Sequence, residues 1–332
     1  MTETKTTVEK PVTHTHIGGQ ALLEGIMMRG KYNWAVAVRE PSGAIYTEEH
    51  DLISAKDRHA WLKWPIMRGM WGFYETMALA IKAFGISAEH AGETEDEQLS
   101  SKEIGVTMLL GVVLAVGLFI VAPAFITNWL VGSQIERPLT WNIVDGVLRL
   151  AVFFGYIWAI SRIKDIQRVF AYHGAEHKTI HAYEHGLPLE VENIQRWKTL
   201  HVRCGTSFLL MVMVIAVIVF SLVPGKAILA AWGVAGGPWV LFFNIGIRIL
   251  LLPLIAGLAY EVTVKWAGSH PNSPVVKVLM WPGMQLQRMT TREPEDDMIE
   301  IAVAAMNLIV AREDREAAAL PSGTVTAIPA LD

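Results

Sequence analysis

The chain has 332 residues, of which 52% are hydrophobic, with a formal net charge of -4 and a mean hydropathy of +0.34. This apolar content excludes an ordinary soluble domain, and the lack of a basic block leads us to expect no nucleic-acid partner. The single cysteine, Cys204, excludes an intrachain disulfide and fits a reducing compartment.

The N-terminal part begins with a polar segment and continues with short stretches whose polarity alternates. We expect residues 1–16 to form a disordered tail without a cleavable signal peptide, and residues 17–103 to form a cytoplasmic region. Within it, Trp34–Arg39 and Ala44–Glu49 alternate in polarity and predict a small β-hairpin. Ile66–Glu89 predicts an amphipathic helix, lying either in the membrane plane or on the protein's own core.

A glycine-rich segment, Gly18–Gly30 (GGQALLEGIMMRG), precedes the hairpin. Its glycines allow tight turns or close backbone approach. It is not a phosphate-binding loop, because it lacks Gly-Lys-Ser/Thr and no strand is apparent before it. We interpret it either as a buried connector packed on the catalytic loop or as a substrate contact.

Four apolar segments are long enough to cross a bilayer, which needs about 20 residues. Two of them carry no charge, and two contain a few charged or polar residues. In chain order they are Ile104–Ile135, Ile143–Ile160, Cys204–Gly225 and Trp239–Tyr260. The sequence therefore predicts a four-helix transmembrane domain over residues 104–261, and the lipid bilayer is an expected partner.

The basic residues predict the orientation of these helices. Residues 1–103 hold eleven Lys and Arg, residues 161–204 hold seven and residues 262–332 hold six, whereas the two intervening loops hold one each. Basic residues accumulate on the cytoplasmic side of membrane proteins. We therefore expect a multi-pass protein with both termini and the His-rich loop 161–204 in the cytoplasm.

Residues 262–316 follow the last predicted span as a cytoplasmic region. Pro274–Pro282 is interpreted as loop-like, and a closing helix follows through Met298 and Leu308. Residues 317–332 are predicted to form a second disordered tail.

The central loop contains His173, Glu176 and His177 in the order His-x-x-Glu-His. On a helix, the two histidines lie one turn apart on one face, which suits two ligands of one zinc-like ion. The intervening Glu176 is then free to act as general base. Gly174 within the motif weakens a helix and counts slightly against this geometry.

Other donors lie nearby. Glu184 continues the same helical face and is a candidate fourth ligand or partner of a ligand, while His201 or Cys204, just before the third span, could supply a third donor. Alternatively, a cytoplasmic helix carries exposed histidines, and Cys204 is a small buried apolar residue.

Charged residues within the predicted spans form a further group: Asp145 and Arg149 on the second span and Arg248 on the fourth. An unpaired charge in hydrocarbon costs several kcal/mol. This intramembrane polar network is interpreted either as an ion path or as a structural network that fixes helix packing.

Several motifs in the same order resemble the DUF1385 family, the YqhQ-like bacterial membrane proteins. The resemblance covers about residues 17–311 and includes RVFAYHGAEHKTIHAYE, HVRCGTSF, PLIAGLAYE and PGMQLQRMTTREP beside the glycine-rich segment. It implies a bacterial cytoplasmic membrane protein and a metal-dependent enzyme of unknown reaction.

By motif match, the resemblance singles out seven candidate metal-site or catalytic residues: His173, Glu176, His177, Glu184, His201, Cys204 and Glu261. Glu261, as a metal donor, is implied only by the resemblance. Val202 departs from the family's proline, and Asp145 stands where Glu is more frequent. His181 and His185 lie outside the pattern and rank below the others.

The sequence thus predicts a mainly α, polytopic membrane protein with about four transmembrane helices and a small N-terminal β-hairpin element. We expect a metal-dependent, hydrolytic enzyme at the cytoplasmic face, with a divalent ion, Zn²⁺ first, and Glu176 as base. A homo-oligomer is also expected. The alternatives are a non-enzymatic oligomeric channel, transporter or regulator that uses the intramembrane Asp/Arg charges, and an assembly partner whose soluble parts dock another protein.

Overall fold

The computed structural model describes residues 15–53, 55–91, 101–132, 137–201, 204–223, 228–229, 231–233, 239–267, 269–270 and 273–319. The strands are β1 (Gly18–Leu22), β2 (Gly25–Arg29), β3 (Asn33–Arg39) and β4 (Ile45–Asp51). The helices before the first span are α1 (Ala55–Arg58), η1 (Ala60–Lys63) and α2 (Met67–His90). The remaining helices are α3 (Ser101–Val116), η3 (Gly117–Val121), α4 (Ala122–Val131), α5 (Pro138–Ile160), α6 (Lys164–Glu184), α7 (Val191–Gln195), α8 (Gly205–Leu222), α10 (Trp239–Tyr260), η4 (Glu261–Ala267), α11 (Pro274–Thr290) and α12 (Asp296–Ala319).

The N-terminal part is a four-stranded antiparallel sheet of order β1-β2-β3-β4. The predicted hairpin is confirmed as β3 and β4, which pair from Arg39 with Ile45 to Asn33 with Asp51. The glycine-rich segment, in which no strand was predicted, forms β1 and β2. Their turn places Glu24 at φ 47°, a conformation usually taken by Gly or Asn, so the usual hairpin signal is missing from the sequence.

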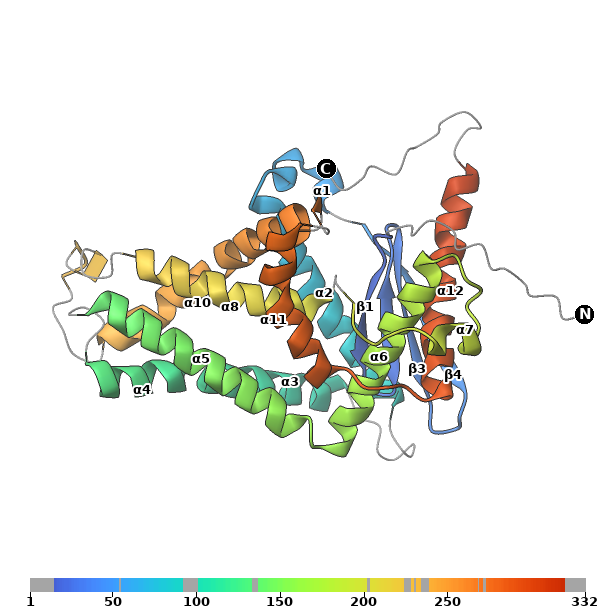
Figure 1. Cartoon of the computed structure of the whole chain (residues 1–332), viewed down its shortest axis with the longest axis horizontal. Helices are drawn as coiled ribbons and strands as arrows, with labels where there is room; N and C mark the ends of the chain where they lie inside the picture. Colours follow the sequence, from blue (N-terminus) through green and yellow to red (C-terminus); the bar gives the residue numbers. More distant parts are fainter. Residues whose placement is uncertain are drawn as a thin grey trace, which may run out of the picture.

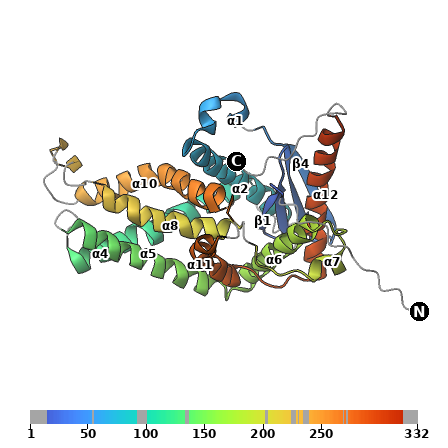
Figure 2. The ribbon, with the colours of Figure 1, turned by 45° about the horizontal axis from the view of Figure 1, so that its top comes forward.

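Helices cover both faces of this sheet, as Figures 1 and 2 show. On one face, Ile26, Met28, Ala35 and Ala37 form a core with α6 and α12. The alternate residues of β2 and β3, among them Met27 and Val36, pack against α2 on the other face. Because side chains alternate along a strand, β3 is apolar at consecutive positions and is buried on both sides. Thus α2 lies on the protein's own core.

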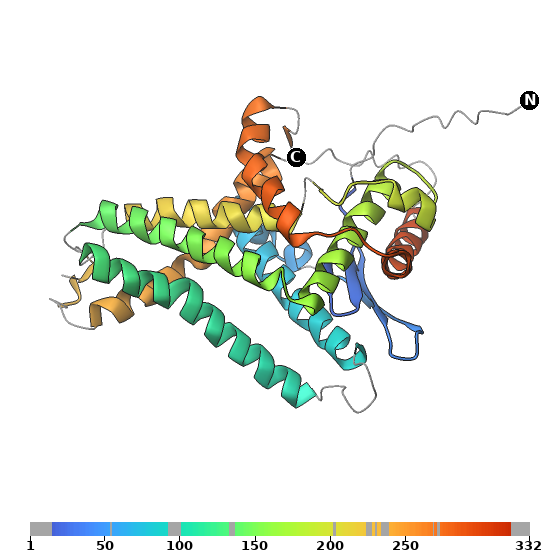
Figure 3. The ribbon, with the colours of Figure 1, turned by 60° about the horizontal axis from the view of Figure 1, so that its bottom comes forward.

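Four helices are long and apolar enough to cross a membrane, judged by length and composition, which confirms the predicted number in the described residues. They are Gly105–Val131, Leu139–Ile160, Gly205–Leu222 and Ile245–Ala267. In Figures 1 and 3, the sheet with α6, α7 and α12 lies at the end of this bundle where α5 ends and α8 begins. The chain therefore returns to the sheet region between the second and third spans.

The structure corrects one local prediction. Pro274–Pro282 is not a loop but part of the helix α11. Pro274 lies in the first turn, where its missing N–H costs nothing, and Val276 and Leu286 are buried as the helix packs on α8. This packing outweighs the unfavourable Pro282 within the helix.

Most of the two predicted tails lies outside the described residues. At their inner ends, Nε2 of His16 lies 2.7 Å from Oε1 of Glu313, and residues 317–319 continue α12. The prediction of disorder remains a prediction for the rest.

Candidate metal centre

The centre is built on one face of α6. His173, His177, His181 and Glu184 follow one another at intervals of four, four and three residues, so they share that face. Nearly the whole of α6 from Ala171 to Glu184 is buried or half-buried, because the helix lies between the sheet and the chain segments after α7 and α11. These histidines are therefore not solvent-exposed side chains on a free helix.

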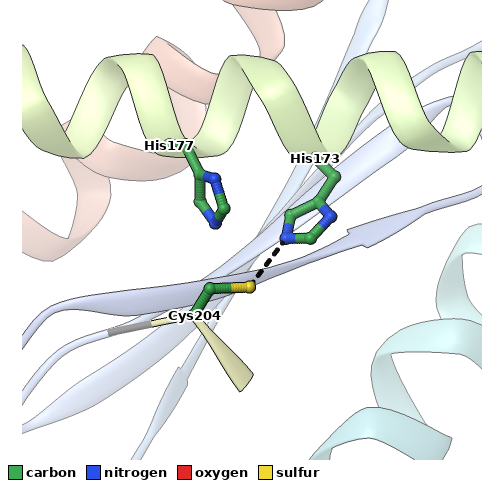
Figure 4. Close-up of side chains that lie close together, drawn as sticks. All are labelled: His173, His177 and Cys204. Carbon is green, nitrogen blue, oxygen red and sulfur yellow. Dashed lines mark hydrogen bonds between the residues drawn. The ribbon is translucent and has the colours of Figure 1, made fainter. Parts of the chain in front are cut away.

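A first donor group consists of His173, His177 and Cys204, one ligand atom from each lying within 4.8 Å of the others. Figure 4 shows both imidazoles directed from α6 toward the thiol, which belongs to the residue just before α8. Nε2 of His173 lies 3.2 Å from Sγ of Cys204. Donor atoms around a tetrahedral zinc ion lie roughly 3.5 Å apart, and the distance between these two donors is close to that value.

Main-chain carbonyls orient both imidazoles of this group. Nδ1 of His173 lies 2.8 Å from the carbonyl oxygen of Thr290, and Nδ1 of His177 is hydrogen-bonded to that of Thr199. A carbonyl only accepts, so each Nδ1 carries the proton and each Nε2 keeps its lone pair. Metal-binding histidines usually have this second hydrogen bond.

Burial alters the pKa values of the titratable groups in this region. It lowers the pKa of His177 well below its ordinary value, with smaller contributions from neighbouring imidazoles, and so favours the neutral ring that a metal requires. Burial also raises the pKa of the Cys204 thiol, while hydrogen bonds with Thr206 oppose that rise. A bound cation would favour the thiolate.

Glu176 is only 5% exposed and lies against Gly19 of β1. A side chain at Gly19 would place Cβ 2.9 Å from Cδ of Glu176, so the glycine makes room for the carboxyl group. Desolvation raises the pKa of Glu176 to about 7, opposed by His173 and by the Gly19 N–H. The glycine-rich segment thus contacts the candidate base through Gly19 of β1, while its second strand, β2, is buried.

A second donor group consists of His181, Glu184 and His201, again with one ligand atom each within 4.8 Å. Glu184 and His201 are both 4% exposed, and Nε2 of His201 lies 3.6 Å from Oε2 of Glu184. His181 had been ranked low because it lies outside the family pattern, although its helical spacing from His177 placed it on the same face. His185, which bonds the carbonyl of His181, belongs to neither group.

The chain segment after α11 crosses α6 at Gly174. A side chain there would place Cβ 2.0 Å from the carbonyl oxygen of Arg292, whose N–H donates to the carbonyl of Phe170. Gly174 therefore permits the close approach that brings the Thr290 carbonyl to His173. This contact, rather than helix weakening, accounts for a glycine within the motif.

A pocket of about 370 Å³ lies beside the carbonyls that orient the histidines. Three basic side chains and one acidic side chain line it. The lining residues are Lys198, Thr199, Leu200, Arg288, Thr291, Arg292 and Glu293.

Glu261 is placed elsewhere. Its Oε1 accepts from Nε of Arg68 at 2.8 Å, its Oε2 from Nη2 at 2.5 Å, and Oε1 also accepts from the N–H of Ile66 at 3.0 Å. Among the described residues it belongs to neither donor group. The structure thus gives the carboxylate implied by the resemblance a role in joining α2 to the end of the fourth span.

The intramembrane charges come together. Oδ2 of Asp145 lies 2.6 Å from Nη1 of Arg248 and 2.8 Å from Nε of Arg149. Arg149 also donates to the carbonyls of Phe119 and Ile120 in the π-helical turn η3. The network joins α5 to the first and fourth spans, which favours a packing role over an ion path.

Together, the fold and the donor groups define a class of protein. It is a membrane protein with four spans, a small sheet at one end of the bundle, and two buried histidine clusters where the second and third spans meet that sheet.

The particular family follows from comparison with known proteins. The model of the family described as "Protein of unknown function (DUF1385)" matches residues 64–312, and the chain belongs to this family. The chain is also 31% identical over 319 residues to the "Uncharacterized protein YqhQ" of Bacillus subtilis (strain 168), covering 89% of this chain and 92% of that protein. No solved structure matches significantly.

Proposed function

We propose that this protein is a metal-dependent membrane enzyme in which His173, His177 and Cys204 hold a divalent ion, Zn²⁺ first, and Glu176 acts as general base. The observation that carries this proposal is the convergence of two imidazoles and the only thiol, 31 residues apart at His173 and Cys204, with each Nδ1 already bonded to a carbonyl. Nitrogen and sulfur donors of this kind suit zinc.

Three protein ligands leave a fourth position for a substrate or water, as in catalytic rather than structural zinc sites. When bound, the ion would lower the pKa of a coordinated water to about 7. Glu176 would take a proton from that water and return it to a leaving group. In the metal-free protein, burial raises its pKa to about 7, and the positive charge of a bound ion would lower that pKa. Hydrolysis is the reaction class that these roles support.

The position of the centre suggests that its substrates bind at the membrane surface. It lies at the end of the α5 and α8 spans, within reach of molecules at a membrane surface. A membrane peptide and a lipid-linked molecule are both compatible with that place. The adjoining pocket is lined by three basic residues, Lys198, Arg288 and Arg292, and by one acidic residue, Glu293. Because this lining has an excess of positive charge, it favours a lipid that carries phosphate.

The metal is tested first. Protein purified without chelators should contain zinc, and its Co²⁺ form should show thiolate-to-cobalt absorption. Cys204→Ser should abolish that absorption and His177→Ala should lower zinc content. His59→Ala, an exposed histidine away from the donor groups, and Glu261→Gln should leave both readings unchanged. Absence of zinc from the wild-type protein, together with no cobalt absorption, would remove the proposal.

The reaction is tested separately. Phosphatidylglycerol vesicles with an inserted transmembrane peptide present both substrate classes at once, and mass spectrometry would identify released headgroup or cleaved peptide. Glu176→Gln should retain the metal but lower any turnover by roughly 10²–10⁴-fold. Equal turnover in the wild type and Glu176→Gln would contradict the assigned base.

The setting is part of the proposal. We place the protein in a bacterial cytoplasmic membrane as a homo-oligomer with both termini and the metal centre in the cytoplasm. The excess of Lys and Arg in the segments that flank the spans on the sheet side supports this orientation. Reporter fusions at each terminus and cross-linking in native membranes would test orientation and assembly.

A further inference from the structure

We propose that His181, Glu184 and His201 form a second cation site, so that the centre holds two metal ions side by side. The inference rests on the proposed function for the first ion, at His173, His177 and Cys204. It adds a ligand, His181, and changes the assignment of Glu184 and His201 from one shared ion to a second one.

The two donor groups are built in the same way. Each takes two residues from α6, His173 and His177 or His181 and Glu184, and a third from the four-residue stretch before α8. No residue is common to both. Along α6, the first group comes before the second, and one helical turn separates His177 from His181. Along the stretch before α8 the order is reversed, because His201 of the second group precedes Cys204 of the first.

The same main chain orients the imidazoles of both groups. The carbonyl of Thr199 bonds His177, and the next carbonyl, that of Leu200, lies 2.9 Å from Nε2 of His181. Gln287 in turn bonds both main-chain polar groups of His201. The second group thus has the hydrogen-bonded support that metal-binding residues usually receive.

The groups are close enough for a paired centre. The ring centroids of His177, in the first group, and His201, in the second, are 5.6 Å apart. In two-metal enzymes the ions lie roughly 3.5–4 Å apart. Imidazoles in contact across the boundary between the groups are compatible with that separation.

Within the second group, the imidazole of His201 and the carboxylate of Glu184 face each other inside the protein. Nε2 of His201 lies 3.6 Å from Oε2 of Glu184, which is near the distance of roughly 3.5 Å between two ligand atoms on one tetrahedral ion. The other carboxylate oxygen of Glu184 accepts from the N–H of Thr15 at 3.0 Å, which fixes the carboxylate. A cation between the three donors would bring these groups into direct contact with one ion.

The chemistry of the two sites differs. The first has a soft thiolate beside two imidazoles, whereas the second has a carboxylate in place of the thiol. Two imidazoles and one carboxylate suit Zn²⁺ and also Mn²⁺ or Fe²⁺. A second ion would supply positive charge at the end of the centre nearer Glu184, where a phosphate oxygen of a substrate could be held.

Metal stoichiometry tests this proposal on the full-length protein. The wild type should bind about two Co²⁺ or Zn²⁺ ions per chain, and His181→Ala about one, with thiolate-to-cobalt absorption intact. Cys204→Ser should lose that absorption and keep about one ion. His185→Ala, on the same helix but in neither group, is the matched control and should bind as the wild type does.

The outcomes separate the two proposals. If the wild type binds a single ion and His181→Ala is unchanged, the second site is refuted while the first stands. If one ion is bound and both His181→Ala and Cys204→Ser lose it, the donors share one ion and the two-site arrangement is refuted. If no ion is bound by the wild type, both proposals fail. A folding defect is recognised by comparing the unfolding of each variant with that of His185→Ala.

Discussion

Gln287 holds the main chain of His201 at both of its polar groups: Oε1 accepts from the His201 N–H at 2.9 Å, and Nε2 donates to the His201 carbonyl at 2.9 Å. The amide comes from α11 and is fully buried, so no water replaces it. One side chain therefore holds the main chain of His201, the third donor of the second group.

Gln287→Leu should weaken metal binding at the second group because it frees the main chain of His201. Loss of such support usually costs about 10–100-fold in metal affinity. The buried His201 N–H would also lose its bond to Gln287, at roughly 1–3 kcal/mol, whereas the His201 carbonyl would keep the N–H of Cys204. Competition with a fluorescent chelator measures affinity, and unfolding in detergent measures stability. Gln285→Leu, two residues away on α11, is the control and should bind metal normally; equal affinities in the two variants would contradict this role.

Gly174→Ala should destabilise the protein, whereas Gly85→Ala should not. At Gly174 the new Cβ meets the Arg292 carbonyl at 2.0 Å, and the crossing chain must shift with the Thr290 carbonyl that orients His173. Overpacking of this kind costs about 1–3 kcal/mol. At Gly85, in α2, the Cβ meets nothing within 4 Å, and the helix gains up to about 1 kcal/mol. Measuring the free energy of unfolding and the zinc content of both variants would check that stability falls in Gly174→Ala and does not fall in Gly85→Ala.

The burial of Glu176 predicts a pH dependence of stability in the metal-free protein. Its pKa is about 7 in the folded state and 4.5 ordinarily, so between these pH values the folded state binds more protons than the unfolded state. Stability then falls as pH rises from 4.5 to 7, by roughly 3 kcal/mol in all, and the loss is constant above pH 7.

Glu176→Gln removes this contribution and leaves those of the histidines in place. The free energy of unfolding of the variant minus that of the wild type should therefore rise between pH 4.5 and 7 and then level off. Denaturant unfolding of chelator-treated protein across this range is the measurement. A difference that does not change with pH would show that folding does not raise the pKa of Glu176.

Asp145→Asn should destabilise the helix bundle without removing the metal. The substitution leaves Arg248, buried beside it, without its carboxylate partner, and breaking such a pair costs about 3–5 kcal/mol. Thermal unfolding in detergent would report the loss, and zinc content of the folded fraction should stay normal. Asp165→Asn, in the exposed first turn of α6, should change stability by about 1 kcal/mol or less. A large loss of zinc in Asp145→Asn would instead connect the network to the metal centre.

Much of the fold could be predicted from local patterns in the sequence. The four spans follow from long apolar runs, two of them without a charge, and the β3–β4 hairpin follows from alternation with a turn. Each of these patterns depends on residues near one another in the chain. The placement of His173 and His177 on one face likewise follows from helical spacing alone. The strands β1 and β2 and the helix α11 could not be found in this way, since their glycine and proline content opposes the structure that packing stabilises.

The sequence by itself determined that this is a multi-span helical protein with a histidine-rich helix between the second and third spans, because hydrophobic length and helical period are local properties. Only the tertiary structure decided which distant groups meet that helix. Cys204 and the Thr290 carbonyl contact His173, and Glu176 packs against Gly19. Glu261 pairs with Arg68 and belongs to neither donor group. These contacts join residues far apart in the chain, and their formation depends on how helices and sheet pack together, which spacing along the sequence does not encode.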